Sequence, residues 1–92
     1  MIVRIATERQ YRLPDGEADR LNELDNAAVE AVDAGDEARF HELFEEMLTV
    51  VRRDGQLLEE DELAASEIIL PPPDLSFEEA KGEFTGEGLI PD

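Results

Sequence analysis

The fold is decided by residues 17–53, which read EADRLNELDNAAVEAVDAGDEARFHELFEEMLTVVRR. In both halves of this stretch, apolar side chains recur at the spacing that places them on one face of a helix. Gly35 and Asp36 stand between the halves; glycine often ends a helix, and aspartate often caps the start of the next one. Because only these two residues separate the segments, we predict two antiparallel helices, over residues 17–34 and 37–53, that form a helical hairpin.

The second predicted helix carries the wider apolar stripe. Its polar face holds Glu42, Glu45 and Glu46, and like charges at these spacings cost about 0.2–0.5 kcal/mol per pair. Tertiary packing, rather than intrinsic helix propensity, must therefore hold this segment. We expect the second helix to be the centre of the core.

Two short strands are predicted before the helices. Residues 1–5 alternate between two faces with the period of a half-buried strand, and residues 10–13 repeat the alternation. The connecting residues 6–9 lack the glycine or asparagine that a tight turn prefers, but we still expect the strands to pair as a hairpin. Asp15, which follows a proline, is the expected N-cap of the first helix.

The chain changes character after Gly55. An acidic run at residues 59–62 precedes the apolar run Ile68–Leu70, which three prolines end. β-Branched residues in this position favour a short strand at the edge of the N-terminal hairpin. Further on, Ser76 and Glu79 have the spacing of a capping box, which predicts a short helix over residues 77–84.

Together these segments predict one α+β domain over residues 1–92. Its architecture is an antiparallel two-helix hairpin packed on a small antiparallel sheet of two or three strands, plus a short C-terminal helix. Hydrophobic residues make up 41% of the chain, which is enough for an independent core of modest stability. The predicted core consists of Val3, Ile5, Tyr11, Leu13, Leu21, Leu24, Ala28, Val32, Phe40, Leu43, Phe44, Met47 and Val51.

Charge decides which classes of partner are compatible with the chain. There are 25 Asp and Glu residues against 8 Lys and Arg, and the net charge is −17. Such a surface repels nucleic acid and anionic lipid, which leaves proteins as the expected partners. The sequence has no cysteine and no apolar run of the ~20 residues that a membrane span needs. We therefore expect a cytoplasmic protein that a partner could recruit to the membrane.

Candidate chemistry is sparse. His41 and Glu42 look briefly like a zinc-protease helix, but that motif needs a second histidine one turn later, and the chain has only one histidine. The acidic run at residues 59–62 lacks the glycine and the ligand spacing of a calcium loop. We predict no catalytic residues, no metal site, no cofactor and no small-molecule substrate.

Two groups of apolar residues are candidates for protein binding. Ile68, Ile69, Leu70 and Pro71 could present an exposed edge or an extended ligand for an aromatic groove; the alternative is a buried edge strand that the prolines end. Val29, Leu48 and Leu58 could offer an apolar stripe to a partner helix; the alternative is that they pack internally.

Several stretches, taken in order along the chain, resemble a known family. They are Met1–Ile5, Gln10–Tyr11, Leu21–Asn26, Val29–Asp36, Ser66–Asp74 and Glu87–Pro91. This ordered combination is similar to the PspA-associated domain (PspAA), which accompanies phage-shock protein A (PspA) in actinobacteria and archaea. Members of that family often carry glycine in the first hairpin turn, where this chain has Thr7–Arg9.

The resemblance implies a non-enzymatic accessory or adaptor of an envelope-stress response. Such a protein would bind PspA, a membrane-remodelling coiled-coil protein, or a partner of PspA. The resemblance supplies no catalytic residues. Two other functions stay open from the residues alone: a metal-dependent enzyme subunit that uses His41 with nearby carboxylates, and an acidic mimic of nucleic acid that occupies a basic groove.

Overall fold

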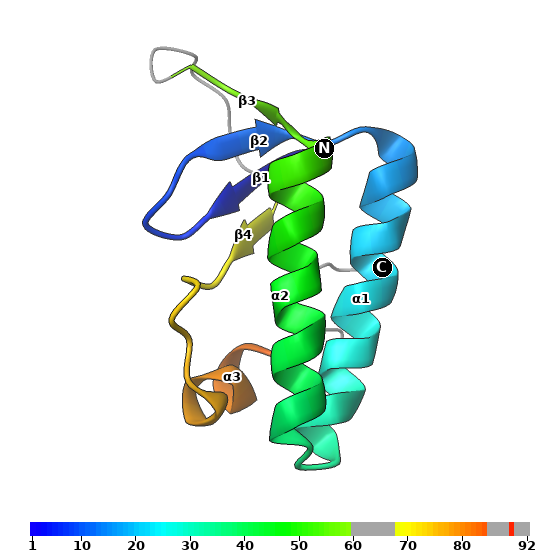
Figure 1. Cartoon of the computed structure of the whole chain (residues 1–92), viewed down its shortest axis with the longest axis vertical. Helices are drawn as coiled ribbons and strands as arrows, with labels where there is room; N and C mark the ends of the chain where they lie inside the picture. Colours follow the sequence, from blue (N-terminus) through cyan, green and yellow to red (C-terminus); the bar gives the residue numbers. More distant parts are fainter. Residues whose placement is uncertain (60–67, 85–88, 90–92) are drawn as a thin grey trace.

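The computed structural model describes residues 1–59, 68–84 and 89 of the chain (Figure 1). Its elements, in chain order, are β1 (Ile2–Ile5), β2 (Gln10–Arg12), α1 (Asp15–Asp33), α2 (Glu37–Asp54), β3 (Gln56–Leu57), β4 (Ile68–Leu70) and α3 (Phe77–Glu83). The two long helices run antiparallel, and α2 lies between the sheet and α1 in Figure 1. This arrangement confirms the α+β class, the helical hairpin and the short C-terminal helix.

The sheet differs from the prediction in the number of its strands and in the direction of β4. In the part of the chain that the structure describes, it has four strands in the order β3-β2-β1-β4. The pairs β1–β2 and β2–β3 are antiparallel, whereas β4 pairs with β1 in parallel. The prediction missed β3 because two residues are too few to show a strand period. It missed the parallel pairing because alternation identifies a strand without indicating its direction.

The turn between the long helices is built as the sequence predicts. Gly35 has φ +72°, a left-handed conformation that glycine adopts at little cost. The Asp36 side chain accepts a hydrogen bond from the Arg39 amide at 3.1 Å, so Asp36 is the N-cap of α2. The predicted N-cap of α1 is wrong, because α1 begins at Asp15 itself and Pro14 occupies the cap position with no side-chain hydrogen bond.

Glycine also permits the sharp entry from α2 into β3. A Cβ atom added at Gly55 would collide with the Val51 carbonyl oxygen and approach the Tyr11 Cβ to 3.0 Å. The Gly55 amide donates to that same carbonyl oxygen at 2.9 Å. Residue 55 therefore has no room for a side chain where α2 ends and the chain turns to pair with β2.

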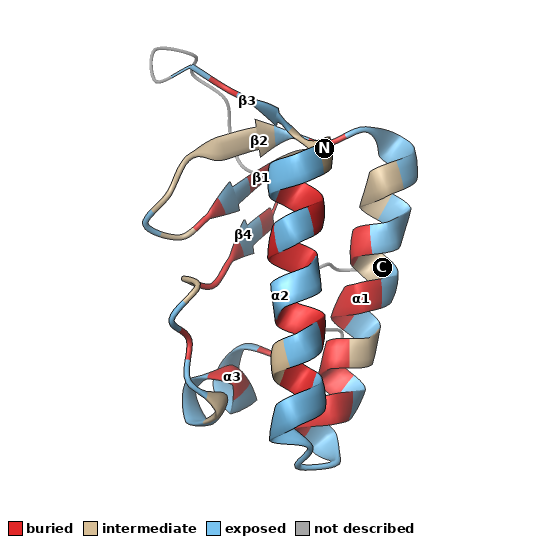
Figure 2. Ribbon diagram, viewed as in Figure 1, coloured by how far each residue is buried: buried red, intermediate tan, exposed pale blue. Residues whose placement is uncertain are grey.

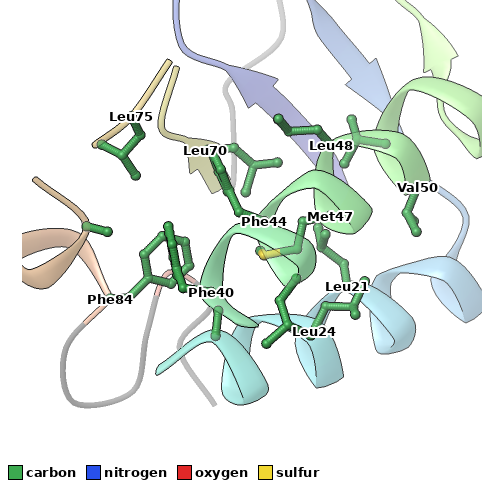
Figure 3. Close-up of a cluster of buried hydrophobic side chains, with 14 of the residues drawn as sticks. Leu21, Leu24, Phe40, Phe44, Met47, Leu48, Val50, Leu70, Leu75 and Phe84 are labelled. Carbon is green, nitrogen blue, oxygen red and sulfur yellow. The ribbon is translucent and has the colours of Figure 1, made fainter. Parts of the chain in front are cut away.

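The core lies between α1, α2 and the inner face of the sheet (Figures 2 and 3). Every residue of the predicted core is buried except Tyr11, which is partly buried. An aromatic cluster joins the third helix to this core. The Phe40 ring lies 5.7 Å from the Phe44 ring and 5.1 Å from the Phe84 ring, centroid to centroid. The predicted capping box is present, with Ser76 and Glu79 each bonding the other's backbone amide.

The first hairpin turn contains a strained residue. Thr7 has φ +67°, and a left-handed conformation costs a residue with a Cβ roughly 1–2 kcal/mol. Asparagine tolerates this conformation because its short polar side chain can hydrogen-bond to the local backbone. We expect Thr7→Asn to raise the free energy of unfolding by about 1 kcal/mol, which corresponds to a rise in Tm of roughly 4–8 °C.

Thr49→Asn is the matched control for this prediction. Thr49 is an exposed residue of α2, where threonine and asparagine have similar helix propensities, and so we expect no gain in Tm. Both variants are compared with the wild type by thermal unfolding. A Thr7→Asn variant that melts at or below the wild-type temperature would show that the turn is not strained.

Candidate protein-binding surfaces

The predicted binding run at β4 is mostly interior. Ile68 and Leu70 are buried, whereas Ile69 between them is 58% exposed, because successive side chains of a strand point to opposite faces. Pro71 is buried as well. β4 is an edge strand of the sheet, as the sequence predicts, but Ile69 is the residue of this group that offers an exposed side chain.

The second predicted group, Val29, Leu48 and Leu58, is buried in the structure. Val29 and Leu48 belong to the main hydrophobic core, which is the internal packing that the sequence left open as the alternative. Leu58 follows β3; its amide donates to the Gln10 carbonyl at 3.0 Å, and its carbonyl accepts from the Arg9 guanidinium at 2.9 Å. Binding of a partner by these three residues stays a prediction, and their side chains are covered in the isolated chain.

A surface that the sequence analysis missed is the face of the sheet opposite the helices. We name as the outer sheet face the residues Arg4, Arg12, Gln56 and Ile69, all exposed, together with the partly buried Ile2 and Gln10. The cross-strand register aligns them: Arg4 pairs with both Gln10 and Ile69, and Arg12 pairs with both Ile2 and Gln56. Residues paired across neighbouring strands point to the same face, and the four strands contain no acidic residue.

The helices, by contrast, present many carboxylates, which pair with the nearby cations. The ion pairs are Arg20–Glu46, Arg39–Glu42, Arg52–Glu8, Arg53–Asp54 and Lys81–Glu78. Exposed pairs such as these contribute little to stability. Carboxylates remain in excess on this side of the molecule, so the exposed faces of α1 and α2 form an acidic surface.

A small carboxyl cluster lies where α1 begins and α2 ends. The pKa of Glu17 is raised, chiefly because its carboxyl is hydrogen-bonded to that of Asp54 and lies close to its charge. The pKa of Asp54 is lowered, chiefly by a hydrogen bond from Arg53. Asp54 also lines a surface hollow, together with Met1, Arg12, Leu13, Pro14, Asp15 and Gln56.

This cluster predicts coupled titration. In Asp54→Asn, the pKa of Glu17 should fall, because the neighbouring negative charge is gone and Arg53 no longer has Asp54 as its partner. Because the folded-state pKa of Glu17 is raised, its contribution to stability is greatest at low pH and is lost as pH rises through that pKa. Because the folded-state pKa of Asp54 is lowered, its contribution to stability is greatest at higher pH and is lost as pH falls through that pKa.

NMR titration of the Glu17 side chain in the wild type and in Asp54→Asn measures this effect. Asp19→Asn serves as a control, because Asp19 is an exposed residue of the same helix and is absent from the groups that shift the pKa of Glu17. A Glu17 pKa that is the same in the wild type and in Asp54→Asn would show that the two carboxyls do not interact.

His41 is the residue on which a metal-dependent activity would depend. Its Nε2 lies 3.7 Å from the Glu37 carboxylate on the same exposed helix face, and its ring meets the Phe40 ring edge-on. Among the residues that the structure describes, no group of three or more histidine, aspartate or glutamate side chains is arranged to hold a metal ion. Nor does any helix in the described ranges have the length and apolar character to cross a membrane.

The described residues form a small, acidic α+β protein with acidic helix faces and an outer sheet face that carries Arg4 and Arg12. The family comparison is consistent with this class: the model of the PspA-associated protein family (PspAA) matches residues 1–92. The chain belongs to this family, whose name associates it with PspA. Neither a search of curated proteins nor a search of solved structures returns a match.

Proposed function

We propose that this chain is a non-enzymatic accessory of a phage-shock-type membrane stress response, and that it binds PspA or a protein partner of PspA directly. The observation that carries this proposal is the family match over the whole of residues 1–92. The chain would work in the cytoplasm and reach the membrane through its partner. On this proposal it supplies a binding surface and no catalytic group.

The distribution of charge supports a role in protein recognition. The net charge is −17, and the acidic surface lies on the long helices, where the hydrophobic core holds the backbone in place. An acidic surface of this kind accelerates encounter with a basic partner face, and salt weakens the effect. The proposed contact is therefore between the acidic faces of α1 and α2 and a basic patch on the partner.

A titration of the purified full chain against PspA from the same genome tests the proposal. We expect saturable binding at micromolar concentrations in low salt, with an association rate that falls as salt is added. The double variant Glu30→Lys/Glu45→Lys, which reverses one exposed charge on each long helix, should associate more slowly. No binding to PspA in low salt would contradict direct contact with PspA, and the same titration against proteins that co-purify with PspA would then test the remaining part of the proposal.

A further inference from the structure

We propose that the outer sheet face is a second docking surface, opposite in charge to the helices, and that it binds an acidic, amphipathic segment of a protein partner. This inference deepens the proposed function and rests on it, since it assumes that the chain acts by binding proteins. It concerns a different face of the molecule and a partner segment of the opposite charge.

The cations of the sheet and those of the helices differ in whether they have carboxylate partners. The cations on the helices are matched by carboxylates, and Arg9 bonds to the Leu58 carbonyl. Arg4 and Arg12 are exposed, and neither forms an ion pair with a carboxylate anywhere in the described ranges. Acidic residues outnumber basic residues in the ranges that the structure describes, so two arginines left without such partners there are available to carboxylates from another molecule.

No negatively charged side chain on the same strands competes for these two arginines. β1, β2, β3 and β4 contain no aspartate or glutamate, so Arg4 and Arg12 project from a surface whose strand neighbours are neutral. Most of the carboxylates in the described ranges lie on the helices, and Asp15 and Asp54 reach the hollow that Arg12 also lines without forming an ion pair with it. A guanidinium is well suited to this role, because its planar fork can bind a carboxylate through two hydrogen bonds.

Apolar side chains lie beside the arginines on the outer sheet face. Ile69 is 58% exposed, and the parallel register places it directly beside Arg4. Ile2, also on this face, is partly buried and pairs with Arg12. A partner segment that combines carboxylates with apolar side chains would complement both features, whereas a purely acidic segment would leave the isoleucines in water.

Charge also argues against other occupants. A nucleic acid or an anionic membrane is a dense array of charge and would meet the repulsion of the whole chain, for which two arginines compensate little. A second copy of this chain carries acidic helices, but each copy brings a net charge of −17, which opposes association. A short acidic segment of another protein carries fewer charges and experiences mainly the local field of the two arginines.

The test uses the full chain and a synthetic helical peptide with leucine along one face and glutamate along the other. Binding is followed by fluorescence anisotropy in low salt. We expect the double variant Arg4→Gln/Arg12→Gln to weaken binding about tenfold, which corresponds to removal of two exposed charge pairs. Ile69→Thr should also weaken binding. The matched control Arg39→Gln/Arg52→Gln removes two helix arginines that already have partners and should leave the affinity unchanged.

A second peptide, with glutamine in place of glutamate, should bind more weakly than the acidic peptide. Failure of the wild type to bind the acidic peptide, or equal binding by the Arg4→Gln/Arg12→Gln variant, would overturn the proposal. Peptide binding that is seen only after substitutions neutralise the acidic residues 59–62 of the chain would overturn the proposal as well. Dimerisation that the double arginine variant abolishes would identify a second copy as the occupant and would also overturn it.

Failure of the docking surface can be distinguished from failure of the proposed function. PspA binding that weakens in Glu30→Lys/Glu45→Lys, together with no capture of the acidic peptide, would leave the accessory role intact and remove the outer sheet face from it. Peptide capture through the arginines in a chain that fails to bind PspA or proteins that co-purify with it would support the docking surface while contradicting the proposed partner.

Discussion

Phe44→Ala should lower the free energy of unfolding by about 3–5 kcal/mol, the cost typical of truncating a buried phenylalanine. The Phe44 side chain is 1% exposed. Its ring stacks on that of Phe40 at 5.7 Å and meets the Phe84 ring edge-on at 6.1 Å. Truncation therefore removes a ring where α2 meets the end of α3. Domains of this kind have total stabilities of about 5–15 kcal/mol, so a large share would be lost.

Urea denaturation followed by circular dichroism measures this loss. Phe77→Ala is the control, because Phe77 is only partly buried at the start of α3 and its ring lies 6.0 Å from that of Phe40. We expect a clearly smaller decrease for Phe77→Ala. A Phe44→Ala variant that loses less than about 1 kcal/mol would show that the aromatic cluster is not the packed centre described here.

Asp25→Ala should cost about 1–3 kcal/mol, because it leaves a partly buried hydrogen-bond donor, the Leu89 amide, without its acceptor. Asp25 is fully buried on α1, and its Oδ1 accepts a hydrogen bond from the Leu89 amide at 3.0 Å. This bond joins residues 64 positions apart in the chain and fixes Leu89 against α1. Asp25→Asn keeps an acceptor oxygen of the same shape and should therefore cost less.

Two measurements distinguish this role from a general effect of removing a charge. Urea denaturation gives the loss of stability, and hydrogen exchange at the Leu89 amide reports the bond itself. In Asp25→Ala the Leu89 amide should exchange faster than in the wild type. Asp19→Ala, at an exposed position of the same helix, should change neither quantity. Wild-type stability and Leu89 exchange in Asp25→Ala would refute the anchoring role.

The helical part of the fold was predictable because its signals are local. A helical period in each segment, a glycine–aspartate pair between them and a capping box at Ser76 each act within a few residues. The first N-cap was mispredicted by one residue, because Pro14, whose ring fixes φ near the helical value, takes the cap position without a side-chain hydrogen bond.

The sheet and the surfaces were less predictable because they depend on contacts between distant segments. Nothing local indicates that β4 joins β1 in parallel or that the two residues of β3 complete the sheet. Without that register, nothing relates Arg4 to Arg12 or Ile69. The alternation within β1 indicates only that Arg4 and Val3 point to opposite faces of the strand. Asp25 gives no sign in the sequence that it is buried, because most aspartates on helices face solvent.

The alternation that predicted strands could also have refined the candidate binding residues. It places Ile68 and Leu70 on one face and Ile69 on the other, so one face must be buried if the strand joins the core. Val29 and Leu48 lie beside strong core positions of their helices and are buried with them. In so acidic a chain, a search of the predicted strands for arginine or lysine, rather than for apolar runs, would have drawn attention to Arg4 and Arg12.

If the proposed function holds, this chain acts by binding PspA or a PspA partner through its surfaces. The most direct test is an NMR footprint of the isotope-labelled full chain, recorded in low salt with unlabelled PspA and then with proteins that co-purify with it. With one of these partners, we expect saturable shift changes at exposed acidic positions of α1 and α2, such as Glu30 and Glu45, while core amides such as that of Met47 stay unchanged. Spectra that remain the same at saturating concentrations of every one of them would contradict the proposed function.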